Sequence, residues 1–332
     1  MPAWHDRQIV IAGAGAVGGY VGGMLAAAGR DVVLLGREEP MRRIAAEGLR
    51  LTNLEGLDRT LSPRAVSDPQ VLAGAGLILV TVKSGGTAEM AGLIAAHAPE
   101  DVIVISLQNG VVNPRVLREA LPGRTVLAGM VPFNIVWLGP THLHRGSAGQ
   151  ILIGAGNSQA VQALSAPGLP VAEAPGIEAV QWGKLLINLN NALNALSGLP
   201  LRDQLLSPGW RRLLAAQIDE ARAVLKAAGI PVRSPLPLPI GLFPTLLRLP
   251  TFLFMVAAKR TLPVDPKARS SMWDDLERRR ATEIDALQGE VMALAERHRM
   301  AVPLIGKVAA LVKQAEAAKA GPPGLTPDVL KW

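Results

Sequence analysis

The first half of the chain alternates short apolar runs with helical stretches. The run at 9–12 is followed at once by a helical stretch rich in small residues, and the runs at 77–83 and 101–110 are separated by another helical stretch. Continuous apolar runs of this length are typical of strands buried on both faces of a parallel sheet. We expect further strands at 31–38, around 125–137 and at 149–154.

The second half of the chain has a different pattern. From about residue 177 the apolar positions recur with the period of an α-helix, and 176–198 is predicted to be one long helix that ends at Gly198 as its C-cap. Ser271 and Thr282 each stand three residues before an aspartate, which is the spacing of a capping box. We therefore expect two helices that begin at these residues.

This change of period divides the chain into two predicted domains. We expect an α/β fold, with an N-terminal Rossmann-type dinucleotide-binding domain over 1–175 and an all-α domain over 176–332. The composition agrees with a folded protein, because 49% of the 332 residues are hydrophobic and only 18% are charged.

Two apolar segments raise the question of a membrane. Segment 236–258 is long enough to span a bilayer, but it contains four prolines and Arg248, so we expect short helices or a lid, with membrane association as the alternative. Segment 9–28 is rich in glycine and follows no cluster of positive charges. We therefore expect no signal peptide and a cytoplasmic protein.

Charge and residue types exclude several classes of site. The chain has no cysteine, which excludes a disulfide scaffold, a thiolate zinc site and a cysteine nucleophile. Its net charge of +7 favours an anionic partner, but aromatic residues make up only 3%, so we expect a small anionic ligand and no nucleic acid. His142 and His144 lie two residues apart without a third ligand nearby, so we expect no metal site.

The clearest motif is a glycine-rich loop after the first strand. Gly13, Gly15 and Gly18 have the G-x-G-x-x-G spacing, and only this glycine-rich stretch stands between a strand and a helix. The first glycine makes the tight turn, the second lets the backbone approach a pyrophosphate, and the third packs the helix on the strand. We expect a dinucleotide here, with Ala16 and Val17 at the helix N-terminus beside it. The alternative is a glycine turn without a ligand.

The strand ends predict the kind of dinucleotide. The second strand ends in Gly36-Arg37 where an NAD site has an acidic residue, so Arg37 favours the 2′-phosphate of NADP, and a surface arginine is the alternative. Lys83 and Asn109 follow the two later strands. Because ligands bind outside the carboxyl ends of parallel strands, we expect both residues near the nicotinamide.

Candidate catalytic residues lie in the helical half. Lys184 and Asn188 are one turn apart and share a face of the helix 176–198. A lysine there is suited to act as a general acid, and the alternative is a lysine that extends its ammonium to solvent. On one straight helix Ser271 and Glu283 would lie about 18 Å apart, but a bend at the arginines between them brings both to one site. The alternative for each is a helix cap.

At this point the chain resembles the ketopantoate reductase (2-dehydropantoate 2-reductase) family over nearly its whole length. The resemblance implies a Rossmann domain, a helical C-terminal domain, NADPH, and reduction of a 2-keto acid to a 2-hydroxy acid. The matching pieces, in the family's order and spacing, are "GAGAVGG", Lys83, "QNG" at 108–110, "GKLLIN" at 183–188 and "SSMWDDLERRRATEID" at 270–285.

The resemblance also implies a role for each matching residue. Lys184 is the general acid, and Asn109 and Asn188 orient the substrate and the nicotinamide. Ser271 holds the substrate carboxylate, and Glu283 bonds a substrate hydroxyl or the catalytic lysine. The chemistry agrees, because hydride addition to a ketone leaves an oxygen that needs a proton, and a desolvated lysine has its pKa lowered toward neutrality.

Two departures concern the substrate. Many members of the family have asparagine at the positions of Ala192 and Ala268, where it would contact polar groups of the substrate. These departures leave a more apolar or bulkier 2-keto acid as an alternative substrate. Independently of them, the alternatives to a 2-keto acid reductase are an imine reductase, an oxidising dehydrogenase and a non-catalytic NADPH sensor. The predicted helices 282–299 and 305–319 form either a homodimer face or part of the core.

Overall fold

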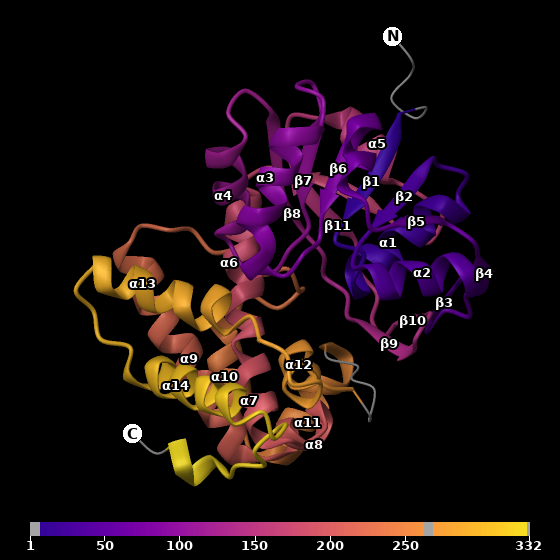
Figure 1. Ribbon diagram of the computed structural model, residues 1–332. Coiled ribbons are helices and arrows are strands. Elements are labelled where there is room, and N and C mark those ends of the chain that lie inside the picture. The colour runs from indigo at the N-terminus through magenta and orange to yellow at the C-terminus, as the bar shows by residue number, and fades with distance from the viewer. Residues whose placement is uncertain (1–6, 262–267, 331–332) are drawn as a thin grey trace. The chain divides into compact units, whose positions relative to one another are not determined.

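The computed structural model describes residues 7–261 and 268–330 of the chain. The chain divides into two compact units, Met1–Glu178 and Ala179–Trp332 (Figure 1). All of the described strands belong to the first unit, and the described part of the second unit is helical. This confirms the predicted fold class, an α/β N-terminal part followed by an all-α C-terminal part.

The main sheet of the first unit has eight strands in the order β12-β11-β8-β7-β6-β1-β2-β5. Neighbouring strands pair in parallel except β8 and β11, which are antiparallel. The chain runs outward from β1 to β5 on one side and from β6 to β8 on the other, so the strand order reverses at β1. The strands are β1 (Gln8–Ala12), β2 (Val32–Leu35), β5 (Arg64–Val66), β6 (Ala75–Val80), β7 (Ile103–Ser106), β8 (Thr125–Met130), β11 (Ile151–Gly154) and β12 (Val171–Ala174).

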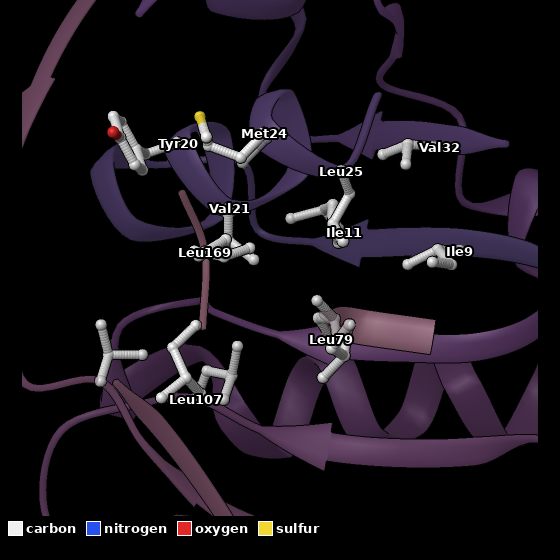
Figure 2. Close-up of a cluster of buried hydrophobic side chains, with 14 of the residues drawn as sticks. Ile9, Ile11, Tyr20, Val21, Met24, Leu25, Val32, Leu79, Leu107 and Leu169 are labelled. Atoms are coloured by element: carbon white, nitrogen blue, oxygen red, sulfur yellow. The ribbon is translucent and has the colours of Figure 1, made fainter. Parts of the chain in front are cut away.

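Both faces of this sheet are covered. Ile9 and Ile11 of β1 belong to one buried cluster together with residues of α1, and Figure 2 shows Leu25 of α1 beside Ile11. Val10 belongs to a second buried cluster on the other face. This two-sided burial explains why β1 is a continuous apolar run rather than an alternating one. The helices of this unit are α1 (Ala16–Ala27), α2 (Glu38–Glu47), α3 (Thr87–His97), α4 (Asn113–Ala120) and α5 (Ser158–Leu164).

A second sheet of four strands, in the order β4-β3-β10-β9, is absent from the sequence prediction. The predicted strand around 125–137 is wrong as a single element, because its start forms β8 of the main sheet and its end begins β9 of the second sheet. β4 gives no apolar alternation, since Asp58, Arg59 and Thr60 are all exposed. The four strands are β3 (Leu49–Asn53), β4 (Asp58–Leu61), β9 (Ile135–Gly139) and β10 (His142–Arg145).

The second unit is built around the long helix α9, which contacts α8, α10, α13 and α14. Its apolar positions recur with the helical period, and side chains such as Leu214, Ile218 and Leu225 are buried. Besides α9 (Pro208–Ala227), the helices are α6 (Ile177–Asn188), α7 (Asn190–Ser197), α8 (Leu201–Leu206), α10 (Phe243–Arg248), α11 (Thr251–Thr261), α12 (Ser271–Glu277), α13 (Glu290–Arg297) and α14 (Pro303–Ala318).

The prediction of one unbroken helix over 176–198 is wrong. The helix is interrupted at Leu189, which separates α6 from α7. The carbonyl oxygen of Leu189 accepts a hydrogen bond from Gln288 Nε2 at 3.0 Å, and Gln288 is fully buried. A side chain inserted against the helical hydrogen-bond ladder is a known cause of such a bend. The predicted end of the stretch is confirmed, because Gly198 is the C-cap of α7 with φ +68°.

The segment 236–258 folds into short helices, as expected. It includes a 3₁₀ turn at Ile240–Leu242, then α10, and then most of α11. Arg248 at the end of α10 pairs with Asp219 of α9 at 2.6 Å. No helix among the described residues is both long and apolar enough to cross a membrane.

A helix begins near each of the two predicted starts, but the residues that cap these helices differ from the predicted ones. The N-cap of α12 is Ser270, whose Oγ accepts from Trp273 N at 3.1 Å, so the prediction of Ser271 as the cap is wrong by one residue. At the second start Thr282 Oγ1 accepts from Ile284 N at 3.2 Å. Asp285 was expected to complete that cap, but it pairs instead with Lys313 of α14 at 2.7 Å.

Candidate active site

The glycine loop connects β1 to α1 at the strand where the sheet order reverses. Gly13 has φ +104°, and a Cβ there would lie 2.5 Å from Val82 N. A Cβ at Gly18 would collide with Thr81 Oγ1 and would lie 2.8 Å from the carbonyl oxygen of Gly13. These two glycines are therefore required by the protein's own packing.

Gly15 is different. A Cβ at this position would meet nothing closer than the carbonyl oxygen of Gly13 at 3.9 Å, and the residue is exposed. The protein itself thus leaves the space in front of Gly15 open. Gly15 is also the N-cap of α1 without a side-chain cap, and Ala16 and Val17 form the first turn, which has no acidic residue. Unpaired N–H groups at a helix N-terminus fit a pyrophosphate, so this loop fits a dinucleotide.

The residue predicted to select the dinucleotide lies directly after β2. Arg37 is exposed and is the N-cap of α2. Glu38 and Glu39 follow it in the first turn of α2, where negative charges interact favourably with the positive end of the helix dipole. Arg37 is therefore the first cationic side chain beyond the end of β2, the strand that pairs with β1.

Two further predicted residues follow neighbouring strands of the same sheet. Lys83 lies after β6 and is exposed, and Asn109 lies after β7 and is half-buried. Because β6 pairs in parallel with both β1 and β7, the glycine loop, Lys83 and Asn109 all follow carboxyl ends at one edge of the sheet. This is the edge at which open parallel sheets bind ligands.

A buried hydrogen-bond network, which was not predicted from the sequence, links the segments that follow β6 and β7. Gln108 Nε2 donates to the carbonyl oxygen of Val82 at 2.9 Å and to Thr87 Oγ1 at 2.7 Å. Asn113 Nδ2 donates to the carbonyl oxygen of Asn109 at 2.7 Å, and its Oδ1 accepts from Thr87 Oγ1 at 2.8 Å. The backbones next to Lys83 and Asn109 are thus linked through amide side chains. The available signal was the glutamine of "QNG", which follows an apolar strand.

In the second unit, Lys184 and Asn188 lie one turn apart on α6 and both are half-buried. Their helix neighbours Leu185, Leu186 and Leu189 are fully or almost fully buried. Burial lowers the pKa of Lys184 to about 8, and the negative charge of Glu283 opposes this by raising it. Lys184 and Glu283 therefore lie within electrostatic range of each other, and Lys184 loses its proton at a lower pH than a lysine in solvent.

Gly183 is a second residue whose importance the sequence did not reveal. A Cβ there would collide with the carbonyl oxygen of Arg233 and would lie 3.3 Å from Pro235. The N–H of Arg233 also donates to the carbonyl oxygen of Ala179 at 2.9 Å, one turn earlier on α6. The segment 233–235 therefore packs directly on the helix backbone beside Lys184, which only glycine permits.

Of the remaining two predicted residues, Ser271 begins α12 and Glu283 lies beyond the turn that follows α12. Ser271 is exposed at the first position of α12, because Ser270 takes the capping role. Glu283 precedes a π-helical turn, Asp285–Gly289, and its carbonyl oxygen accepts from Ala286 N at 3.1 Å. π-helical turns are frequent at functional sites.

The two histidines of the second sheet are hydrogen-bonded to the same threonine. His142 and His144 lie on β10, and both contact Thr52 Oγ1, at 2.9 and 2.8 Å. No group of three or more metal-ligating side chains was found within the described parts of the chain.

Two family descriptions match this chain. "Ketopantoate reductase PanE/ApbA" matches residues 9–158, and "Ketopantoate reductase PanE/ApbA C terminal" matches residues 176–316. The first match contains the glycine loop, Arg37, Lys83 and Asn109, and the second contains the candidate catalytic residues of the helical unit.

Individual relatives are similar over almost their whole length. The 2-dehydropantoate 2-reductase of Halobacterium salinarum is 29% identical over 318 residues, which cover 93% of this chain and 99% of that protein. A PanE/ApbA family ketopantoate reductase from Ralstonia eutropha JMP134, solved by crystallography, is 30% identical with a TM-score of 0.81 and covers 94% and 99% of the two chains. A D-mandelate dehydrogenase solved with NADH and anilino(oxo)acetate has the same fold, with 21% identity and a TM-score of 0.80 over 94% and 99%.

Proposed function

The chain belongs to the ketopantoate reductase family, and on that basis we propose that it reduces a 2-keto acid to a 2-hydroxy acid with NADPH. The favoured substrate is 2-dehydropantoate, because relatives that match end to end are 2-dehydropantoate 2-reductases. The product is then pantoate.

The observation that carries the proposal is the position of Lys184. It lies on a helix whose neighbouring side chains are buried, one turn before Asn188, and within range of the charge of Glu283. A lysine fully in solvent keeps its proton at neutral pH and is a poor acid there. Its pKa of about 8 makes Lys184 an efficient proton donor near neutral pH.

Lys184 completes the reaction with a proton. NADPH, when bound, supplies a hydride to the carbonyl carbon of the substrate. The carbonyl oxygen keeps the electron pair of the broken π bond, and the Nζ–H bond of Lys184 breaks to give that oxygen its proton. Lys184 is left as a neutral amine, which solvent reprotonates. Its positive charge also stabilises the developing alkoxide before the proton moves.

Neighbouring side chains orient the substrate. Asn188 lies on the same face of α6 and donates an amide N–H to the carbonyl oxygen without adding charge. Glu283 raises the pKa of Lys184, which keeps the lysine protonated when substrate arrives. Ser271, exposed at the start of α12, donates its hydroxyl to the substrate carboxylate, and Asn109 orients the nicotinamide.

The cofactor is proposed to lie along the edge of the main sheet. The N–H groups at the start of α1, including those of Ala16 and Val17, bind the pyrophosphate in the open space before Gly15. Arg37 binds the 2′-phosphate and thereby favours NADPH over NADH. Lys83, which follows β6, also contacts the cofactor.

The test is the loss of NADPH absorbance when the purified protein is mixed with ketopantoate, with NADH and Lys184→Ala run beside it. Turnover that prefers NADPH and falls by about 10²- to 10⁴-fold in Lys184→Ala supports the proposal. Tight NADPH binding without turnover of any 2-keto acid refutes it in favour of an NADPH sensor.

A second candidate is the reduction of a more apolar 2-keto acid. Ala192 is fully buried and Ala268 presents only a methyl group, so neither position offers a hydrogen bond to a hydroxyl of the substrate. Without such bonds the enzyme discriminates weakly against substrates that lack the hydroxyl. A kcat/KM for 2-oxoisovalerate or phenylglyoxylate above that for ketopantoate favours this candidate.

A further inference from the structure

Arg269 and Trp273 form a cation–π pair at the start of α12. The guanidinium carbon of Arg269 lies 4.9 Å from the centroid of the Trp273 ring, and the two residues are four positions apart. An indole face attracts a guanidinium and helps to hold it in place. The pair brackets Ser271, the residue proposed to hold the substrate carboxylate.

Both members of this pair have a buried donor without an acceptor. Among the residues that the structure describes, Arg269 Nη1 and Trp273 Nε1 are buried nitrogen atoms without a hydrogen-bond partner. Buried donors in folded proteins are nearly always satisfied, so each exception calls for an explanation. Arginine and indole N–H groups donate only, and the acceptor that suits a cationic donor beside a neutral donor is an anion.

The backbone that carries the pair is fixed on both sides of Arg269. The carbonyl oxygen of Ala268 accepts from Leu201 N at 2.9 Å. Ser270 N donates to Asn194 Oδ1 at 2.9 Å, and Ser270 Oγ donates to the carbonyl oxygen of Asn191 at 3.0 Å. Asn194 is fully buried. Arg269 and Ser271 are thus held against α7, the helix that continues the chain from Lys184 and Asn188.

A bound 2-keto acid would favour another cation in the helical unit. A 2-keto acid brings a carboxylate, but the positive charge of Lys184 is committed to the carbonyl oxygen and Glu283 adds a negative charge beside it. Ser271 offers a neutral hydroxyl only. A guanidinium is the group best suited to bind a carboxylate, because its planar N–H groups match the two oxygens.

We propose that Arg269, positioned by Trp273, is the cation that binds the carboxylate of the 2-keto acid beside Ser271. Trp273 holds the guanidinium through the cation–π contact and contributes its own Nε1–H. This inference rests on the proposed function for the identity of the ligand. It makes Arg269 and Trp273 determinants of the preference for acids over neutral ketones.

The test compares an acid with its neutral counterpart. With NADPH saturating, kcat and KM are measured for ketopantoate and for its primary amide in the wild type, Arg269→Met, Arg269→Lys and Trp273→Phe. For Arg269→Met we expect the KM for ketopantoate to rise about 10- to 100-fold, with kcat/KM for the amide unchanged within about threefold. Arg269→Lys keeps a cation and is expected to lose less than Arg269→Met. Trp273→Phe keeps an aromatic face for Arg269 but lacks the indole N–H, and is expected to raise KM for the acid alone.

Arg280→Met is the matched control, because Arg280 is exposed on the turn after α12 and its loss changes the net charge equally. Its KM values should match the wild type. An equal loss for acid and amide in Arg269→Met would overturn the proposal, since a merely structural role affects both. If Arg269→Met does not fold, Arg269→Lys decides the question: a loss confined to the acid supports the proposal, and an equal loss for the acid and the amide overturns it.

A binding measurement separates this inference from the proposed function. Oxamate carries the carboxylate and carbonyl of a 2-keto acid but is not reduced, so it is titrated calorimetrically into wild type and Arg269→Met saturated with NADPH. Weaker binding by tenfold or more in the variant supports the anion site even if no 2-keto acid is turned over. Equal binding in both proteins, or no binding in either, overturns it even if the wild type reduces ketopantoate.

Discussion

Gln288 Nε2 donates a hydrogen bond to the carbonyl oxygen of Leu189 at 3.0 Å, at the residue where α6 ends and α7 begins. Leu189 directly follows Asn188, and Gln288 lies in the π-helical turn that comes after Glu283. One buried hydrogen bond therefore joins the backbone next to Asn188 to the turn that follows Glu283. The bend in the helix and the π-helical turn have this contact in common.

Gln288→Leu should destabilise the protein because it leaves the Leu189 carbonyl buried without its donor. We expect a loss of about 1 to 3 kcal/mol in the free energy of unfolding, measured by urea denaturation. Gln314→Leu is the control, since Gln314 is exposed on α14 and its replacement should change stability by less than about 0.5 kcal/mol. A Gln288→Leu protein as stable as the control would show that the bend does not depend on this bond.

The pH dependence of reduction should follow Lys184. The group must be protonated to act as an acid, so kcat/KM for reduction should be level below pH 8 and fall as the pH rises through about 8. Because Glu283 raises the pKa of Lys184, Glu283→Gln should lower it and move the fall to lower pH.

Glu296→Gln provides the control for the pH profile, because Glu296 is exposed on α13. Its profile should coincide with that of the wild type. A profile for Glu283→Gln that moves to higher pH, or one for the wild type that stays flat to pH 10, would contradict the assignment of Lys184 as the acid.

Gly15→Ala and Gly18→Ala should have opposite consequences. A methyl group at Gly15 meets no protein atom closer than 3.9 Å, so we expect the melting temperature to be unchanged and NADPH affinity to fall about tenfold or more. A methyl group at Gly18 collides with Thr81, so we expect a loss of about 1 to 3 kcal/mol of stability. Thermal denaturation and NADPH fluorescence titration distinguish the two. Normal NADPH affinity in a folded Gly15→Ala protein would place the pyrophosphate elsewhere.

The inner strands of the main sheet were predictable because they are buried on both faces. Runs such as 77–83 need no knowledge of their partners to be recognised, since burial alone makes them apolar. The edge strands β5 and β12 and the second sheet were not predicted, because these strands are only partly buried and β4 is mostly exposed. The parallel pairing of Arg50 with His142 in the second sheet joins segments far apart in the chain, and local sequence carries no signal for such a contact.

The candidate site divides in the same way. Gly13 could be singled out because it belongs to a G-x-G-x-x-G motif between a strand and a helix. Lys184 and Glu283 could be singled out because charged residues are uncommon on helices that are otherwise apolar. The contacts of Gln288 with Leu189 and of Arg269 with Trp273 depend on how helices pack, and a glutamine or an arginine on a predicted helix has a solvent-exposed position as its ordinary interpretation. The shift of the α12 cap to Ser270 has a similar origin. The spacing to Asp274 favours Ser271 as the cap, but the hydrogen bond from Ser270 Oγ to the carbonyl oxygen of Asn191 is a tertiary contact that the local pattern does not contain.

The preference for NADPH should depend on Arg37. It is exposed directly after β2, and its guanidinium is suited to bind a 2′-phosphate, which NADH lacks. Arg37→Ser should therefore weaken NADPH binding about 10- to 100-fold and leave NADH binding nearly unchanged, as measured by fluorescence titration of the two cofactors.

Arg42→Ser is the control, because Arg42 is also exposed on α2 but lies a full turn further from the strand end. The salt dependence of the NADPH dissociation constant is a second readout. A contact between an arginine and a phosphate weakens as ionic strength rises, so NADPH binding by Arg37→Ser should depend less on salt than binding by the wild type. A parallel loss of NADPH and NADH binding in Arg37→Ser would show that the arginine supports the loop rather than the 2′-phosphate, and NADP would no longer be the favoured cofactor.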